Sequence, residues 1–160
     1  MSWETSIKGF KSYLQIERSL SDNSVQAYIR DVNKFANYAI PSNLSELKIT
    51  REDISNFLVK LNKEDISARS QARIISGIKA FYKYLIIEDY IKYDPTELIE
   101  SPKIGLKLPD TLSLIEIDKL IAAIDLSSKQ GERNRAIIES LYSCGLRVSE
   151  LVNLQLSNIH

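Results

Sequence analysis

SARSQARIISGIKAFYKYLIIE, residues 67–88, carries a strongly periodic signal. Its apolar residues recur at intervals of three and four, as on one face of a helix with 3.6 residues per turn. They are Ile74, Ile78, Phe81, Tyr82 and Leu85. The spacing predicts one long amphipathic helix, and the same period recurs along nearly the whole chain.

The opposite face of this predicted helix carries only positive charge. Arg69, Arg73, Lys79 and Lys83 share one arc of roughly 120° with Ser76. Residues 67–87 contain no acidic side chain, although like charges four residues apart on a helix repel each other. An anionic partner would relieve this repulsion, and DNA phosphates fit that description. A solvated or acid-paired face is the alternative, and the pattern by itself favours that alternative.

The residues before this segment predict three further helices, over 5–18, 24–39 and 50–62. Thr50 and Asp53 have the spacing of a capping box, which marks a helix start. A short helical turn is expected at 95–99. The first hundred residues therefore predict a four-helix bundle with a short fifth helix, within an all-α fold.

The second predicted helix has a polar face of its own. Arg30 and Lys34 lie opposite its apolar stripe, beside Asn33 and Asn37. Asp31 is close to both cations, so DNA contact by this face is the weaker hypothesis, and an ordinary solvated surface stays the alternative.

A linker is expected after the bundle. SPKIGLKLPDTLS (101–113) contains two prolines and a glycine, which favours a connection between domains. Beyond it, helices are predicted from Ser113 to about 124, over 132–143, and from about Arg147. Two to three helices are too few to bury a core. We therefore expect domains at 1–102 and 113–160, joined by 103–112, with the second domain incomplete.

Composition narrows the classes of function. The formal net charge is zero, so a nucleic-acid site would have to be a local patch. One cysteine and one histidine disfavour a zinc site, and no disulfide can form within the chain. Neither a signal peptide nor a membrane-spanning run is present. These features predict a cytoplasmic protein with no metal.

CGLRVSEL (144–151) is the most specific motif in the second part. Gly145 suits the end of a helix, and Arg147 falls in the first turn of the next one, where backbone N–H groups favour anions. Glu150 lies within reach to orient the guanidinium. The arrangement could clamp a phosphate. It could equally be an Arg147–Glu150 ion pair that only supports packing, and the residues alone favour that interpretation.

The sequence resembles the tyrosine site-specific recombinases, and the Xer type among them. CGLRVSEL is similar to their arginine motif, with Cys144 where threonine or serine is commoner. LSDNSVQAYIRDVNKFANY (20–38) resembles the signature of their SAM-like core-binding domain, with Ser24 at a threonine position. Residues 67–85 resemble their DNA-contacting helix, and 94–113 resemble their interdomain stretch.

The resemblance implies an activity and a partner. The first domain would clamp duplex DNA, and a tyrosine would cut and rejoin the strand through a 3′-phosphotyrosyl intermediate, without a metal or nucleotide cofactor. Arg147 would be the first catalytic arginine, supported by Glu150. Arg30, Lys34, Arg69, Arg73, Lys79 and Lys83 would contact DNA. Family members act as tetramers on paired sites, in some cases with a second Xer-type recombinase.

The remaining catalytic residues of the family follow the arginine motif and are not found here. His160 lies too close to Arg147 to be a catalytic histidine, and none of the tyrosines is nominated as the nucleophile. These 160 residues alone are expected to bind DNA without cleaving it. A start at the core-binding domain favours an Xer role over a phage or transposon integrase. The alternative is a non-catalytic helical module whose basic face binds an acidic protein.

Overall fold

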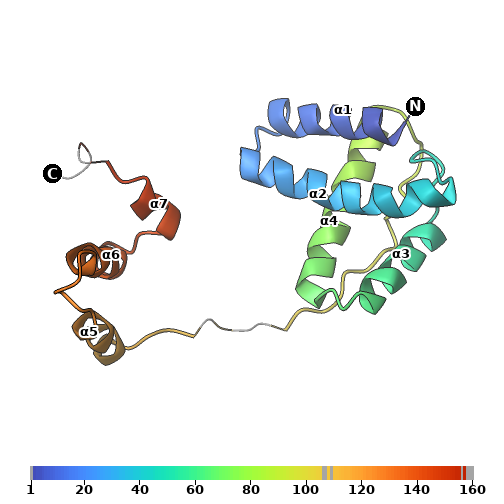
Figure 1. The fold of residues 1–160 in the computed structure, drawn as a ribbon. Coiled ribbons are helices and arrows are strands. Elements are labelled where there is room, and N and C mark those ends of the chain that lie inside the picture. Colours follow the sequence, from blue (N-terminus) through green and yellow to red (C-terminus); the bar gives the residue numbers. More distant parts are fainter. Residues whose placement is uncertain (1, 106–107, 109, 156, 158–160) are drawn as a thin grey trace. The chain divides into compact units, whose positions relative to one another are not determined.

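The computed structural model describes residues 2–105, 108, 110–155 and 157. Helices are the only regular secondary structure in these residues, which confirms the predicted all-α class. None of the described helices is long and apolar enough to cross a membrane. The chain divides into two compact units, residues 1–106 and 107–160 (Figure 1). The boundaries expected at 102 and 113 stay predictions, and the expected linker lies partly outside the described residues.

Four α-helices and a 3-10 turn build the first unit. They are α1 (Trp3–Ile16), α2 (Asp22–Ala39), η1 (Ile40–Ser42), α3 (Arg51–Lys63) and α4 (Ala68–Ile87). α1 and α2 lie side by side, and α4 crosses and contacts both of them (Figure 1). The predicted four-helix bundle is therefore confirmed.

Hydroxyl side chains define where these helices begin. Ser2, Ser21, Thr50 and Ser67 each accept the backbone N–H three residues later, at 3.2–3.4 Å. Because these caps precede the first apolar residue of each stripe, α1 and α2 start slightly before the positions expected from periodicity. The predicted capping box of α3 is present, since Asp53 Oδ2 accepts the Thr50 backbone N–H at 2.8 Å.

The core of the first unit is aromatic. All four phenylalanines of the chain are buried, and each helix supplies one: Phe10, Phe35, Phe57 and Phe81. The ring centroids of Phe10 and Phe81 are 5.5 Å apart, and those of Phe35 and Phe57 are 5.0 Å apart. Trp3 joins the two pairs through Phe35 and Phe81. These contacts join α1 to α4 and α2 to α3 directly, and Trp3 of α1 connects α2 with α4, so the inner faces of the helices are buried and their polar faces point outward.

The short fifth helix expected at 95–99 is a hydrogen-bonded turn instead. The Asp94 carboxylate accepts the backbone N–H and the hydroxyl of Thr96, at 2.7 and 2.6 Å. The backbone then closes with bonds three residues apart, such as Ile99 N–H to the Thr96 carbonyl. The Asp94 carboxylate caps the start of this segment, but the segment ends shortly before Pro102, whose preceding residue disfavours the helical region, so it is too short to form bonds four residues apart.

Three helices form the described part of the second unit: α5 (Leu114–Ala122), α6 (Gly131–Cys144) and α7 (Val148–Val152). The predicted capping box of Ser113 and Glu116 opens α5. Ile117 is the one buried apolar side chain among the residues described in this unit. Leu114, Val148 and several other large apolar side chains are exposed, as expected of helices too few to enclose a core.

Candidate nucleic-acid interface

The crossing of α2 and α4 depends on a glycine. A Cβ atom added at Gly77 of α4 would lie 2.7 Å from the Cβ of Asp31 on α2, closer than side chains tolerate. The missing side chain lets α4 approach α2 closely at this point. Asp31, at the edge of the apolar stripe of its own helix, is thereby buried against α4, at 3% exposure.

Arg73 finds its acidic partner on this neighbouring helix. Its Nη1 atom donates to both carboxylate oxygens of Asp31, each at 2.6 Å. Burial raises the pKa of Asp31, although the charge of Arg73 and its hydrogen bond pull that pKa down. The alternative of an acid-paired side chain therefore applies to Arg73. The sequence of α4 did not indicate this pair, because the acidic partner lies on α2.

The structure brings Arg73 together with the two candidate cations of α2. Arg30, Lys34 and Arg73 line an open groove of about 350 Å³, with Ser67 and Ser70 at the start of α4. Asp65 also lines this groove. Lys34 Nζ lies 3.6 Å from a carboxylate oxygen of Glu64, whereas Arg30 forms no ion pair with the described residues.

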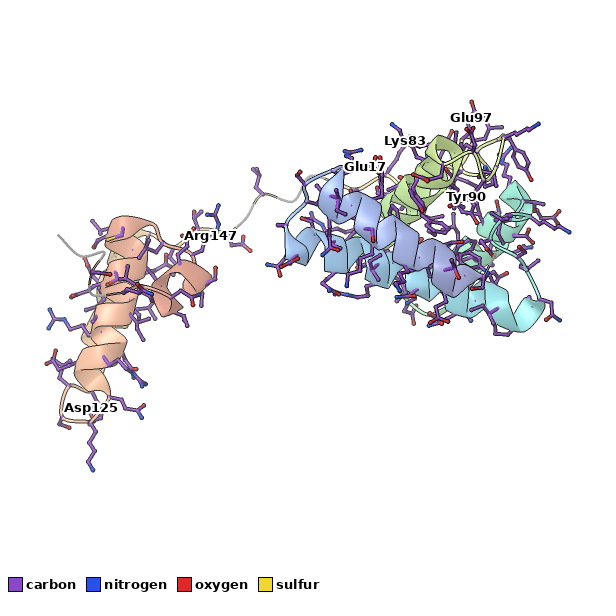
Figure 2. The ribbon with its side chains drawn as sticks, turned by 90° about the horizontal axis from the view of Figure 1, so that it is seen from above. Glu17, Lys83, Tyr90, Glu97, Asp125 and Arg147 are labelled. Carbon is purple, nitrogen blue, oxygen red and sulfur yellow. The ribbon has the colours of Figure 1, made fainter. Side chains whose placement is uncertain are left out.

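The remaining candidates on α4 are unpaired. Arg69, Lys79 and Lys83 form no ion pair and no side-chain hydrogen bond within the described part of the chain. Arg69 and Lys83 are exposed, and Lys79 is half-buried. Lys83 lies toward the C-terminal end of α4 (Figure 2). No acidic side chain among the described residues therefore balances the charge of these three side chains.

Sequence reasoning missed two cations on α1. Lys8 and Lys11 line a groove between α1 and α2 with Asn33, Asn37 and the acidic Glu4. The same two asparagines border a second groove along the outward face of α2, which Gln26 and Arg30 also line. The spacing of three between Lys8 and Lys11 on the polar side of a helix could have indicated them.

Arg147 and Glu150 are adjacent, as predicted, in the second unit. α6 ends at Gly145, whose φ of 62° lies in the left-handed region. The Arg147 backbone N–H donates to Glu150 Oε2 at 2.8 Å, and Arg147 Nη1 donates to Oε1 at 3.0 Å. The Arg147 side chain is 82% exposed (Figure 2). One carboxylate thus orients the guanidinium and caps α7, and the remaining guanidinium donors face solvent. His160 lies outside the described residues.

Both units match known families. The phage integrase N-terminal SAM-like domain matches residues 7–89, and the phage integrase family matches residues 111–160. A tyrosine recombinase XerD of Staphylococcus aureus is 40% identical over 158 residues, covering 98% of this chain and 54% of the relative. XerD of Staphylococcus haemolyticus is 38% identical over the same length. The chain thus spans about half the length of the curated relatives it matches.

Two solved structures share the fold. A crystal structure of XerA recombinase superimposes with a TM-score of 0.50 at 28% identity, covering 99% of this chain and 52% of that one. An integrase from mycobacterium phage Brujita gives a TM-score of 0.57 at 21% identity, covering 91% and 47%. At 21% identity the second likeness concerns the fold alone.

Proposed function

The chain belongs to the phage integrase family of tyrosine recombinases, and we propose that its first unit binds duplex DNA through the outward faces of α2 and α4. The observation that carries this proposal is the unpaired charge of Arg69, Lys79 and Lys83 on a helix without acids. Cations that bind phosphates displace condensed counterions, and this release favours binding to DNA over binding to neutral surfaces. Arg30 extends the same charge to α2.

The whole protein would be a site-specific recombinase of the Xer type, as the XerD relatives suggest. A tyrosine outside these 160 residues would attack the scissile phosphate, form a 3′-phosphotyrosyl bond and release a 5′-hydroxyl. A second 5′-hydroxyl would then reverse the step on the partner strand. The reaction would serve chromosome-dimer resolution or integration, in the cytoplasm.

Arg147 would serve this reaction as a phosphate clamp. Its guanidinium would donate to a non-bridging oxygen and stabilise the negative charge that develops on the pentavalent phosphate. Glu150 already occupies one guanidinium nitrogen and leaves the others to donate elsewhere. Glu150 would therefore orient the clamp without touching the phosphate.

The assembly would be a tetramer on two paired duplexes, with a second Xer-type recombinase as companion subunit. A polypeptide of these 160 residues would bind DNA and not cut it. Incubation with a nicked suicide substrate tests this statement, since a covalent protein–DNA adduct would contradict it.

A gel shift against duplex DNA, with an acidic polypeptide as competitor, tests the DNA-binding proposal. DNA should be retained in the presence of the competitor and released by salt. Release by the acidic polypeptide at equal charge concentration would favour the alternative, a module that binds an acidic protein.

A further inference from the structure

We propose that Asp31 is a positioning residue for DNA binding, which holds the Arg73 guanidinium so that its free edge meets a DNA phosphate. This inference rests on the proposed function and concerns the same surface. It gives a negatively charged residue a favourable role within a surface that binds a polyanion.

Only one of the three guanidinium nitrogens of Arg73 donates a hydrogen bond within the described residues. Both hydrogen bonds to Asp31 come from Nη1, at 2.6 Å. Nη2 and Nε donate to no described residue, although a guanidinium carries N–H groups on all three nitrogens. The Arg73 side chain is 48% exposed, against 4% for that of Asp31. One end of the guanidinium is therefore anchored inside the unit, and the other faces solvent.

The surroundings of that free edge suit a phosphate. On one side lie Arg30, Lys34 and the side chains of Ser67 and Ser70. The opposing charges there are Asp31 and Asp65, which line the same groove, and Glu64, which lies 3.6 Å from Lys34 Nζ. On the other side, Arg73 and Asp31 border a smaller groove with Ser24, Tyr28 and Ser76. Arginine, lysine and serine side chains are among the groups that donate hydrogen bonds to DNA phosphates.

The Asp31–Arg73 ion pair is expected to add little to the stability of the folded state. A buried carboxylate loses its hydration, and the raised pKa of Asp31 shows that its attraction to Arg73 does not fully offset that loss. An anchored guanidinium, by contrast, loses less conformational freedom when it binds a phosphate, so it binds more tightly than a mobile one.

If Asp31 positions Arg73, removing the Asp31 charge changes the DNA affinity in the direction opposite to that expected from net charge. Asp31 contributes negative charge beneath a cationic surface, so removing that charge should tighten DNA binding if charge alone mattered. If Asp31 positions Arg73, removing the charge should weaken binding, because the guanidinium loses its anchor.

The experiment measures the affinity of the 160-residue chain for duplex DNA over a range of salt concentrations. The variants are Asp31→Asn and Arg73→Ala, the double variant, and Glu97→Gln as a control that removes an exposed carboxylate outside these grooves (Figure 2). We expect Asp31→Asn to weaken binding several-fold and to lower the salt slope by about one, as Arg73→Ala does. The double variant should bind no more weakly than Arg73→Ala, and Glu97→Gln should bind as tightly as the wild type or more tightly.

Binding by Asp31→Asn that is as tight as that of the wild type, or tighter, would overturn the inference. Circular dichroism is used to check whether the Asp31→Asn variant is folded. If it is not, Arg73→Lys provides the test: lysine can keep the ion pair but lacks the second set of donors, so it should weaken binding, and unchanged binding would count against the inference. Failure of the wild-type chain to bind DNA at all would instead contradict the proposed function.

Discussion

A Cβ atom on Gly77 would lie 2.7 Å from the Cβ of Asp31, so α2 and α4 cross with the side chain of one helix against the backbone of the other. Arg73, one turn earlier on α4, reaches across this crossing to the Asp31 carboxylate. The close approach, the buried acid and the candidate interface are therefore one arrangement. Substitutions at Gly77, at Asp31 and at the cations of α4 test these features separately.

Gly77→Ala is expected to destabilise the first unit. Alanine favours a helix by about 1 kcal/mol over glycine, but overpacking at a close contact costs about 1–3 kcal/mol. The added methyl meets the Asp31 Cβ, which cannot move without moving α2, so we expect the clash to prevail. Urea unfolding measures the difference. Ser76→Ala, at the exposed neighbouring position, is the control and should be at least as stable as the wild type, since alanine also favours a helix over serine. Stabilisation by Gly77→Ala would refute the close crossing.

Arg69→Ala and Lys83→Ala should each weaken DNA binding and lower its salt slope by about one, because each removes one phosphate contact. The loss should be similar for duplexes of different sequence, since phosphates carry no sequence information. Arg51→Ala is the matched control: this exposed arginine opens α3 and lines none of the grooves described above. Equal losses in all three variants would indicate a general effect of net charge and not a defined surface.

The stability of Asp31→Asn relative to the wild type should depend on pH. Burial raises the pKa of Asp31 above its ordinary value of 3.8, against the opposing charges of Arg73, Arg30 and Lys34. The folded state then holds this proton more tightly than the unfolded state, so the wild-type free energy of unfolding falls as pH rises through that window. Asparagine does not ionise. The free energy of unfolding of the variant minus that of the wild type should therefore increase from about pH 3 upward and then level off. A decrease over this range would mean that Arg73 outweighs burial.

Tyr82→Phe should make the protein more resistant to alkali. Burial, followed by the charge of Glu46, raises the pKa of Tyr82 above its ordinary value of 10.0. Unfolding lets this hydroxyl ionise, so wild-type stability should fall as pH rises above that value, and phenylalanine removes this part of the loss. At neutral pH the variant should lose about 1 kcal/mol, because Tyr82 Oη donates to the Glu46 carbonyl at 3.3 Å. Tyr142→Phe, at an exposed position of the second unit, is the control and should keep the wild-type alkaline slope.

Glu150→Ala should loosen α7 and release Arg147. The carboxylate of Glu150 accepts both the backbone N–H and a guanidinium N–H of Arg147, so alanine removes both contacts. The Cα chemical shifts of residues 148–152 should move toward random-coil values. Glu139→Ala, which breaks the exposed Arg135–Glu139 pair on α6, is the control and should leave α7 as it is. Unchanged shifts in Glu150→Ala would show that Glu150 does not hold this turn.

Local patterns in the sequence were sufficient for much of the architecture. Apolar spacing predicted the four helices of the first unit, because the helical period is a property of neighbouring residues. The Thr50–Asp53 and Ser113–Glu116 caps were also predicted, since each joins residues three apart. Residues 95–99 close as a turn and not as the expected short helix, because the segment ends shortly before Pro102 and is too short for bonds four residues apart.

By itself, then, the sequence determined the helical class, the helix faces, the run of cations on α4, and the motifs that mark the family. The tertiary structure decided which of those cations are already paired. Arg73 and Asp31 stand 42 residues apart in the chain, and Lys34 and Glu64 belong to different parts of the bundle. No helical period relates such residues. They meet because the buried phenylalanines and the bare backbone at Gly77 set the distance at which the helices cross.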